Sequence, residues 1–209
     1  MRIAKEGWPL ILSVSALALL ALLFGWKVIG VVFVLLTAGV AAFFRDPERI
    51  IPTGDELVVS PADGRVVAIA PVEAGALFAD AMTRISIFLS PLDVHINRAP
   101  VAGRVSDVRY QAGKFLPAFK AEASDSNEQN ALHIVDERER NWGVVQVAGI
   151  LARRIVCRAK AGDMLSRGER FGLIMFGSRT DIYLPQGCRV EATEGQRVRG
   201  GETIIGRFL

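Results

Sequence analysis

The sequence predicts a mainly β domain preceded by an apolar helical hairpin, and three observations point to this fold class. Two long uncharged runs, 9–24 and 28–44, lie at the N-terminal end and are separated by three residues. From residue 46 onward, short apolar runs alternate with glycine, proline and aspartate, which is typical of strands joined by tight turns. The chain has 209 residues, so the part after the hairpin is long enough for one sizeable domain or two small ones.

The two apolar runs are 16 and 17 residues long, and as helices they would span about 24–26 Å. A bilayer core of about 30 Å is slightly longer, and Trp8 and Trp26 lie where interfacial aromatic side chains would extend each span. We therefore expect residues 1–45 to form a transmembrane or membrane-embedded helical hairpin. A re-entrant or interfacial hairpin is the alternative. A signal peptide is disfavoured because the second run follows at once, with no clear small-residue cleavage site before it.

Basic residues flank both ends of the predicted hairpin. Arg2 and Lys5 precede the first run, Arg45 and Arg49 follow the second, and Lys27 alone marks the turn. The positive-inside rule places both ends in the cytoplasm. We therefore expect the rest of the chain to lie on the cytoplasmic side of the cell (inner) membrane.

Beyond the hairpin the chain is electrically neutral. It has 25 basic and 22 acidic side chains, and removing the four basic and one acidic side chains of residues 1–45 leaves 21 of each. A neutral body argues against a nucleic-acid partner, because phosphate binding needs a surplus of lysine and arginine. The two cysteines, Cys157 and Cys188, are too few for a disulfide framework and, with two separate histidines, argue against a metal site.

Ten short segments after residue 46 are predicted to be strands, because many carry valine or isoleucine at alternate positions. They are 57–60, 65–70, 84–89, 103–110, 132–135, 144–150, 154–159, 173–176, 181–184 and 203–208. Amphipathic helical patterns are scarce in this part of the chain, and segment 76–82 is the best candidate for a short helix.

Two segments share the pattern G-x-x-[LV]-x-x-G-E followed by an apolar strand, and we call them the echo turns. They begin at Gly162 and Gly195. Glycines six residues apart allow positive φ at both corners of a short excursion. The pattern resembles the turns of lipoyl and biotinyl carrier domains, so we expect a barrel-sandwich-like β domain; two unrelated β-turns are the alternative. A carrier needs an exposed lysine at a hairpin tip and neither turn has one, so the resemblance concerns the fold alone.

The chain offers few candidates for acid–base or nucleophilic chemistry. His95 follows a predicted strand in a proline-bounded polar loop, where catalytic groups often lie, although a histidine satisfied by local hydrogen bonds is the alternative. His133 lies in an alternating strand and is expected to be structural. Gly177-Ser178 joins two strands and by itself indicates only a turn. No G-x-S-x-G elbow, P-loop, G-x-G-x-x-G or H-E-x-x-H motif is present.

Seven motifs occur in order between residue 44 and the C-terminal end. They are Phe44-Arg-Asp-Pro47, Pro61-Ala-Asp63-Gly64, Ser90-Pro-Leu-Asp-Val-His95-Ile-Asn-Arg-Ala-Pro100, Gly113-Lys-Phe-Leu-Pro-Ala-Phe119, Asn127-Glu-Gln-Asn130, Gln146-Val-Ala-Gly149 and Gly168-Glu-Arg-Phe-Gly-Leu-Ile-Met-Phe-Gly177-Ser178-Arg179. Together they resemble the short form of the phosphatidylserine decarboxylase family, and the apolar hairpin also suits that family. No single motif is decisive, but their order and spacing make the resemblance specific.

The resemblance implies a proenzyme that cuts itself between Gly177 and Ser178. The products would be a β chain, 1–177, and an α chain, 178–209, associated as a heterodimer that could dimerise further. In such self-cleavage the serine hydroxyl attacks the preceding carbonyl and turns the peptide into an ester. Elimination then gives dehydroalanine, whose hydrolysis leaves a covalent pyruvoyl cofactor and ammonia.

The implied activity is decarboxylation of phosphatidylserine to phosphatidylethanolamine, a step of phospholipid biosynthesis. The pyruvoyl group derived from Ser178 would form a Schiff base with the substrate and act as the electron sink. By resemblance, His95 is the base for self-cleavage and Asp63 orients it, a Ser-His-Asp arrangement used on the protein itself. His95 is also the implied proton donor after carbon dioxide leaves.

Long-form family members carry a second histidine three positions after the first, where this chain has Arg98. Roles divided between two histidines therefore fall to His95 alone, or Arg98 instead binds the lipid phosphate or carboxylate, which we favour. Lys114, Asn127 and Glu128 lie in segments that resemble substrate loops and are expected to bind the head group. Ordinary loop packing is the alternative for those three residues.

Two other functions remain open at this point. A membrane-tethered, non-enzymatic adaptor would keep an uncut chain and give Ser178 no role. A pyruvoyl decarboxylase of a soluble amino acid would work unchanged without residues 1–44. Within the favoured function, a serine-headed lipid with archaeal ether-linked tails (archaetidylserine) is also open, because the head-group chemistry is identical.

Overall fold

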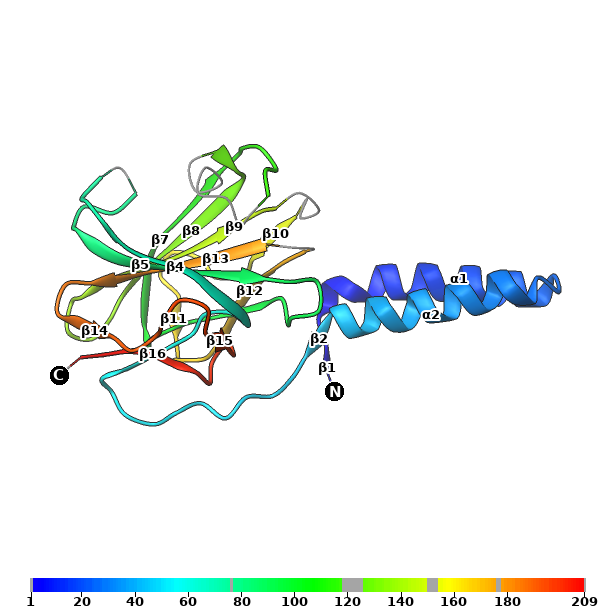
Figure 1. Cartoon of the computed structure of the whole chain (residues 1–209), viewed down its shortest axis with the longest axis horizontal. Coiled ribbons are helices and arrows are strands. Elements are labelled where there is room, and N and C mark those ends of the chain that lie inside the picture. Colours follow the sequence, from blue (N-terminus) through cyan, green and yellow to red (C-terminus); the bar gives the residue numbers. More distant parts are fainter. Residues whose placement is uncertain (1, 76, 118–125, 150–153, 176–177, 209) are drawn as a thin grey trace. The chain divides into compact units, whose positions relative to one another are not determined.

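The structure is a computed structural model that describes residues 2–75, 77–117, 126–149, 154–175 and 178–208 (Figure 1). Two compact units, Met1–Glu48 and Arg49–Leu209, divide the chain. The first unit is helical and the second is built from strands. Each unit is described separately below.

The first unit is a hairpin of two antiparallel apolar helices whose ends carry a short strand pair (Figure 1). Its elements are β1 (Arg2–Ile3), η1 (Lys5–Gly7), α1 (Trp8–Leu23), α2 (Lys27–Phe43) and β2 (Arg45–Asp46). The helical stretch Lys5–Leu23 is long and apolar enough to cross a membrane, whereas Lys27–Phe43 is shorter. Most leucine and valine side chains of both helices are exposed, so the hairpin presents apolar surface outward.

The second unit consists of antiparallel sheets. Its strands are β3 (Leu57–Val59), β4 (Gly64–Val72), β5 (Met82–Leu89), β6 (Ile96–Arg98), β7 (Gly103–Gln111), β8 (Gln129–Val135), β9 (Asn141–Val147), β10 (Ile155–Cys157), β11 (Met164–Leu165), β12 (Arg170–Ile174), β13 (Ser178–Pro185), β14 (Cys188–Val190), β15 (Arg197–Val198) and β16 (Ile204–Phe208). Eight strands form one sheet in the order β11-β7-β8-β9-β13-β5-β4-β15. Two three-stranded sheets, β10-β12-β6 and β14-β16-β3, complete the unit.

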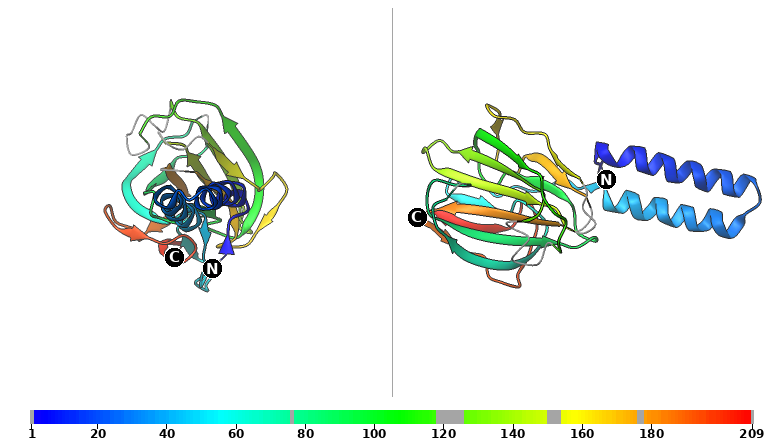
Figure 2. Two further views of the ribbon diagram at one scale, coloured as in Figure 1. Left: turned by 90° about the vertical axis from the view of Figure 1, so that its right-hand side faces the viewer. Right: turned by 90° about the horizontal axis from the view of Figure 1, so that it is seen from above.

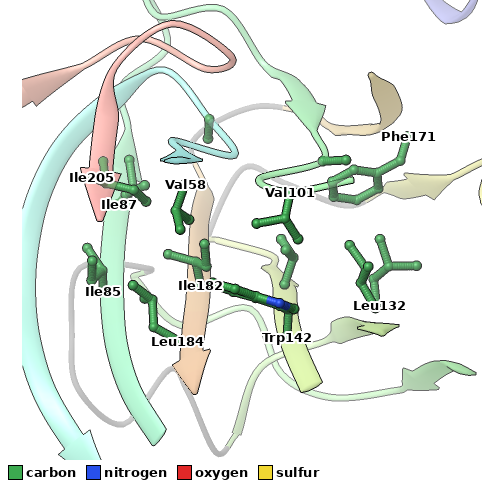
Figure 3. Close-up of a cluster of buried hydrophobic side chains, with 14 of the residues drawn as sticks. Val58, Ile85, Ile87, Val101, Leu132, Trp142, Phe171, Ile182, Leu184 and Ile205 are labelled. Atoms are coloured by element: carbon green, nitrogen blue, oxygen red, sulfur yellow. The ribbon is translucent and has the colours of Figure 1, made fainter. Parts of the chain in front are cut away.

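The large sheet curls around the main hydrophobic core (Figure 2). Alternate residues of β13 point to opposite faces. On one face, Ile182 and Leu184 pack with side chains such as Trp142 in the core of Figure 3. On the other face, Tyr183 packs in a smaller cluster with Phe78. The strand that begins at position 178 is therefore fixed by packing on both sides, and the prediction of a mainly β, barrel-sandwich-like domain is confirmed.

The predicted helix over 76–82 is wrong. Residue 76 lies outside the described residues, 77–81 have no helical hydrogen bonding, and Met82 begins β5. Phe78 explains the difference, because its ring packs on Tyr183 at 4.5 Å and on His133 at 4.7 Å between centroids. A seven-residue segment gains little from a helix by itself, so this tertiary contact decides its conformation.

The echo turns adopt the expected backbone. Their corner glycines all have positive φ, namely 95° at Gly162, 78° at Gly168, 84° at Gly195 and 81° at Gly201. Residues that carry a side chain rarely adopt such φ values, so glycine is needed at each corner. The prediction of two matching turns is confirmed.

Each echo turn binds a second repeated segment, Pro-x-x-Gly-Arg-Val, at 61–66 and at 100–105. The turn from Gly195 donates its corner amides to the carbonyls of Val66 and Ser60, and the turn from Gly162 donates the matching amides to Val105 and Ala99. The paired strands have the same register, since Arg197 faces Arg65 and Met164 faces Arg104. The sandwich is therefore internally duplicated, and Asp63 of one copy corresponds to Ala102 of the other.

Candidate active site

Ser178 is the first residue of β13 and lies opposite Leu89, the last residue of β5. It is fully buried, and its hydroxyl has no hydrogen-bond partner among the residues that the structure describes. A buried hydroxyl without such a partner costs stability, so its position calls for an explanation, and a catalytic role is one. Gly177, the other half of the predicted cleavage site, lies outside the described residues.

His95 immediately precedes β6 and is buried. Its carbonyl accepts a hydrogen bond from the Ile174 amide at 3.3 Å. Ile174 lies four residues before Ser178 in the sequence. Its Nδ1 lies 2.9 Å from the Asp93 carbonyl oxygen. Because a carbonyl oxygen only accepts, Nδ1 carries the hydrogen, and in the neutral ring the lone pair is on Nε2. This tautomer is the one that a general base needs.

The turn that holds the His95 ring is itself fixed by the Asp93 side chain. The carboxylate accepts hydrogen bonds from the Ser90 amide at 2.8 Å and from the Ser90 hydroxyl at 2.6 Å. Arg197 lies 3.3 Å from its other oxygen. Since Ser90 directly follows Leu89, the partner of Ser178, this turn begins beside the start of β13.

A buried hydrogen bond connects the strand of His95 to the strand of Ser178. Asn97 Nδ2 donates to Thr180 Oγ1 at 3.0 Å. His95 is two residues before Asn97, and Ser178 is two residues before Thr180. Residues two apart on an extended chain face the same side. The His95 side chain is therefore expected on the same side as Asn97, and the Ser178 side chain lies on the same side of β13 as Thr180.

The Asn97–Thr180 bond continues into a chain of buried amides. Gln146 Nε2 donates to Asn97 Oδ1 at 2.9 Å, and Asn130 Nδ2 donates to Gln146 Oε1 at 3.3 Å. All four side chains are buried. The chain of amides carries no net charge, so it can fix β6, β8, β9 and β13 relative to one another without the cost of burying ions.

Asp63 lies at the edge of this region. Its two oxygens accept from Arg49 Nη2 at 2.9 and 2.7 Å, and one also accepts from the Gly200 amide at 2.8 Å. Burial raises the pKa of Asp63 and the nearby Asp93 charge adds to this, while Arg49 and the Gly200 amide oppose it. The predicted contact from Asp63 to His95 stays a prediction, because the described Nδ1 contact of the ring is to the Asp93 carbonyl.

Gly64 explains how Asp63 reaches this position. Its φ is 151°, and a Cβ there would collide with the Phe88 carbonyl. Glycine therefore lets the start of β4 approach the end of β5 closely. Asp63 is brought next to the turn that carries Asp93 and His95.

The predicted head-group residues are placed in two groups. Arg98 is buried, donates from Nη1 to the Gly168 carbonyl at 2.9 Å, and lies against Gly201, so it links the two echo turns. Its predicted contact with the substrate stays a prediction. The other three predicted residues lie where the chain segment after β7 meets the segment before β8.

Asn127 uses its whole amide group to hold that meeting point. Oδ1 accepts from the Leu116 amide at 2.9 Å, and Nδ2 donates to the carbonyls of Leu116 at 2.8 Å and Ala148 at 2.7 Å. The Glu128 amide donates to the Lys114 carbonyl at 2.9 Å. Asn127 therefore positions the segment that carries Lys114. Part of the predicted substrate loops, 118–125, lies outside the described residues.

The site also contains residues to which the sequence analysis gave no role, although three of them lie within the seven motifs. Asn97, Asn130 and Gln146 form the amide chain, and Arg49 binds Asp63. The available signal was weak: three polar residues occur inside otherwise apolar strands. From the sequence, Arg49 is interpreted only as a charge that flanks the hairpin. Its contact with Asp63 could not be predicted, because the two residues are distant in sequence.

A buried serine hydroxyl at a strand end and a buried histidine whose Nδ1 faces a carbonyl are the residue types that a nucleophile–base enzyme site needs. The family model for phosphatidylserine decarboxylase matches residues 36–206. The chain belongs to the phosphatidylserine decarboxylase family, and it is accordingly an enzyme of the carboxy-lyase type.

Curated relatives match over nearly the full length. A protein of Symbiobacterium thermophilum is 49% identical over 206 residues, which is 99% of this chain and 95% of the relative. A protein of Geotalea uraniireducens is 46% identical over 204 residues, 98% of this chain and 95% of the relative. Both relatives are named phosphatidylserine decarboxylase proenzyme. The family resemblance predicted from the seven motifs is confirmed.

Proposed function

We propose that this chain decarboxylates phosphatidylserine to phosphatidylethanolamine, using a pyruvoyl group that it makes from Ser178 by cutting itself after Gly177. The observation that carries the proposal is the buried Ser178 hydroxyl, which has no hydrogen-bond partner among the described residues. A pyruvoyl group is made from the serine itself, and position 178 fits it because the residue begins a strand that is anchored on both faces. The proenzyme name of the relatives supports self-processing.

The proposed self-cleavage starts with attack of Ser178 Oγ on the Gly177 carbonyl, while His95 Nε2 takes the hydroxyl proton. The peptide C–N bond breaks, an ester C–O bond forms, and residue 178 gains a free amine. Loss of the Ser178 Cα proton then expels Gly177 as a carboxylate and leaves dehydroalanine. Water hydrolyses the imine tautomer of this residue to a ketone and releases ammonia.

In the decarboxylation itself, the pyruvoyl carbonyl supplies an electron sink for an amine-bearing substrate. Burial at position 178 keeps water from the reacting carbon. His95 Nε2, once protonated, delivers a proton to the carbon that has lost carbon dioxide. Arg98 binds the lipid phosphate or carboxylate, and Lys114 and Glu128 bind the head group on the segment that Asn127 positions.

The proposal assigns the first unit to the membrane. The apolar stretch Lys5–Leu23 supports membrane association, and the basic flanks favour a hairpin with both ends in the cytoplasm. The catalytic domain, 46–209, then works on the cytoplasmic face of the cell membrane as a heterodimer of chains 1–177 and 178–209. A diacyl lipid leaves the bilayer at great cost, so an anchored active site reaches its substrate at the surface.

The test is the intact mass of the denatured protein, wild type beside Ser178→Ala, together with carbon dioxide release from phosphatidylserine. We expect the wild type as two chains, 1–177 and a pyruvoyl-blocked 178–209, and the variant as one uncut, inactive chain. A single full-length mass from folded wild type would contradict the proposal and favour the adaptor. The same head-group assay with ether-linked tails decides between the two lipid classes.

A further inference from the structure

Two aliphatic side chains beside the candidate site are almost completely exposed. Ile50 is 87% exposed and Leu92 is 84% exposed. Leu92 precedes Asp93, whose carbonyl holds the His95 ring, and Ile50 follows Arg49, which binds Asp63. Isolated exposed aliphatic residues are ordinary on protein surfaces, so position next to the site is what distinguishes this pair.

Ion pairs and a backbone hydrogen bond connect the segments of Ile50 and Leu92 to two arginines at the edge of the sandwich. Arg197 pairs with Asp93, the neighbour of Leu92, at 3.3 Å. Arg199 pairs with Glu202 at 3.8 Å, and the same carboxylate accepts the Ile50 amide at 3.3 Å. Directly after Arg199, the Gly200 amide of the same turn donates to Asp63 at 2.8 Å. We call Ile50, Leu92, Arg197 and Arg199 the rim.

The charge of the rim points outward. The side chains of Arg197 and Arg199 are 69% and 73% exposed, whereas those of their partners Asp93 and Glu202 are 12% and 26% exposed. The carboxylates are therefore the more buried partners of the two ion pairs, and the guanidinium groups face the solvent. Exposed ion pairs contribute little to stability, so these cations can take a phosphate oxygen without a large loss.

The internal duplication supplies a comparison within the same chain. In the other copy, the positions of Arg197 and Arg199 are occupied by Met164 and Ser166, and Asp63 is replaced by Ala102. Met164 occupies the same strand register as Arg197. The turn therefore folds without arginine at these two positions, and the copy that has arginine at both is the one that carries Asp63.

We propose that the rim is a lipid-contacting surface, which seats the catalytic unit on the bilayer with Ile50 and Leu92 among the acyl chains and Arg197 and Arg199 on lipid phosphates. Exposed aliphatic side chains combined with cations are the two features that bind anionic bilayer surfaces. The inference rests on the proposed function, since a lipid head group must reach Ser178 from the membrane. It adds a second contact with the bilayer, separate from the hairpin.

The test compares two substrates in one preparation, the full chain reconstituted in phosphatidylcholine vesicles. One substrate is long-chain phosphatidylserine in the same bilayer, and the other is a water-soluble phosphatidylserine with four-carbon chains. We expect Ile50→Ser/Leu92→Ser to lower turnover of the long-chain lipid about tenfold, and Arg199→Gln about fivefold. Turnover of the soluble substrate should stay within about twofold. Met164→Ser is the matched control and should change neither rate.

Each other outcome overturns the inference in a different way. Equal losses on both substrates would mean that the rim serves the active site itself. Unchanged rates on the bilayer substrate would mean that the rim does not contact lipid. A correctly folded wild type that decarboxylates neither substrate would reject the proposed function, and the inference with it.

Discussion

At the scale of single residues, the two histidines have separate roles. His95 has its Nδ1 on a carbonyl, and His133 packs against Phe78, where burial lowers the pKa of the His133 ring. We expect His95→Gln to slow self-cleavage about 10²- to 10⁴-fold, because a general base is lost. His133→Gln is the matched control and should cleave at the wild-type rate. The measurement is a time course of chain 178–209 appearing on a denaturing gel, and equal rates in the two variants would remove His95 from the proposed role.

The carboxyl of Asp63 predicts a pH dependence with a definite sign. Burial, helped by Asp93, raises its pKa, and Arg49 opposes the rise. Arg49→Gln should raise the pKa further, so the carboxylate is lost at a higher pH. We expect the acid limb of the self-cleavage rate to move up by about one pH unit or more. Arg199→Gln, which removes an exposed partner of Glu202, should leave the limb in place.

The raised pKa of Asp63 also makes the stability of the folded chain depend on pH. An aspartate whose pKa is raised by folding holds its proton more tightly in the folded state. Its contribution to stability is therefore present in acid and is lost as the pH rises through the raised pKa of Asp63. Arg49→Gln should deepen this loss at neutral pH, and Arg49→Gln/Asp63→Asn should recover most of it. An acid limb that stays fixed in Arg49→Gln would show that Asp63 does not control the reaction.

At the scale of elements, the Asn97–Thr180 bond holds β6 against β13. Thr180→Val keeps the shape but leaves the buried Asn97 amide without that partner, which costs about 1–3 kcal/mol. We expect slower self-cleavage as well as a lower melting temperature, because Asn97 and Thr180 lie two residues from the proposed base, His95, and the proposed nucleophile, Ser178. Thr83→Val, in β5 and partly exposed, is the matched control. Full-rate cleavage in a destabilised Thr180→Val would limit the amide chain to a purely structural role.

The observed elements also show which parts of the fold can be predicted from sequence patterns. Long strands with alternating valine and isoleucine, such as β5 and β7, are predictable, and so are the echo turns, because glycine at positive φ is a local requirement. Two-residue strands such as β11 and β15 are not predictable, because only their distant partners define them. Segment 76–82 was misread for the same reason, since a contact between Phe78 and Tyr183 decides it.

The candidate site divides in the same way. Ser178, His95 and Asp63 were predicted from motifs that carry the family resemblance, and their roles stay predictions. Arg49 could not, since its partners Asp63 and Glu202 lie 14 and 153 residues away. The amide chain could not either, because an asparagine or glutamine in a strand gives no sign of which distant amide it meets. Sequence therefore suggests candidate reacting groups, whereas the contacts that position them are found only in the structure.

At the scale of the whole molecule, the proposed function assigns anchoring to the first unit and chemistry to the second. The second unit contains the full hydrophobic core and all the described contacts of the candidate site, whereas the first contributes apolar helices. Removal of residues 1–44 should therefore leave a chain that folds and cuts itself. It should decarboxylate the water-soluble phosphatidylserine at close to the full-length rate.

The truncated chain should fail on lipid held in a bilayer. Without the hairpin, the rim alone must hold the catalytic unit at the surface, and two aliphatic side chains with two arginines bind weakly and reversibly. We expect turnover of vesicle phosphatidylserine to fall at least about tenfold and to decline further as salt screens the arginines. The measurement is the ratio of the rates on the two substrates, full chain against truncated chain. An unchanged ratio would mean that the hairpin has no part in substrate access, and a soluble amino-acid substrate would then be the better assignment.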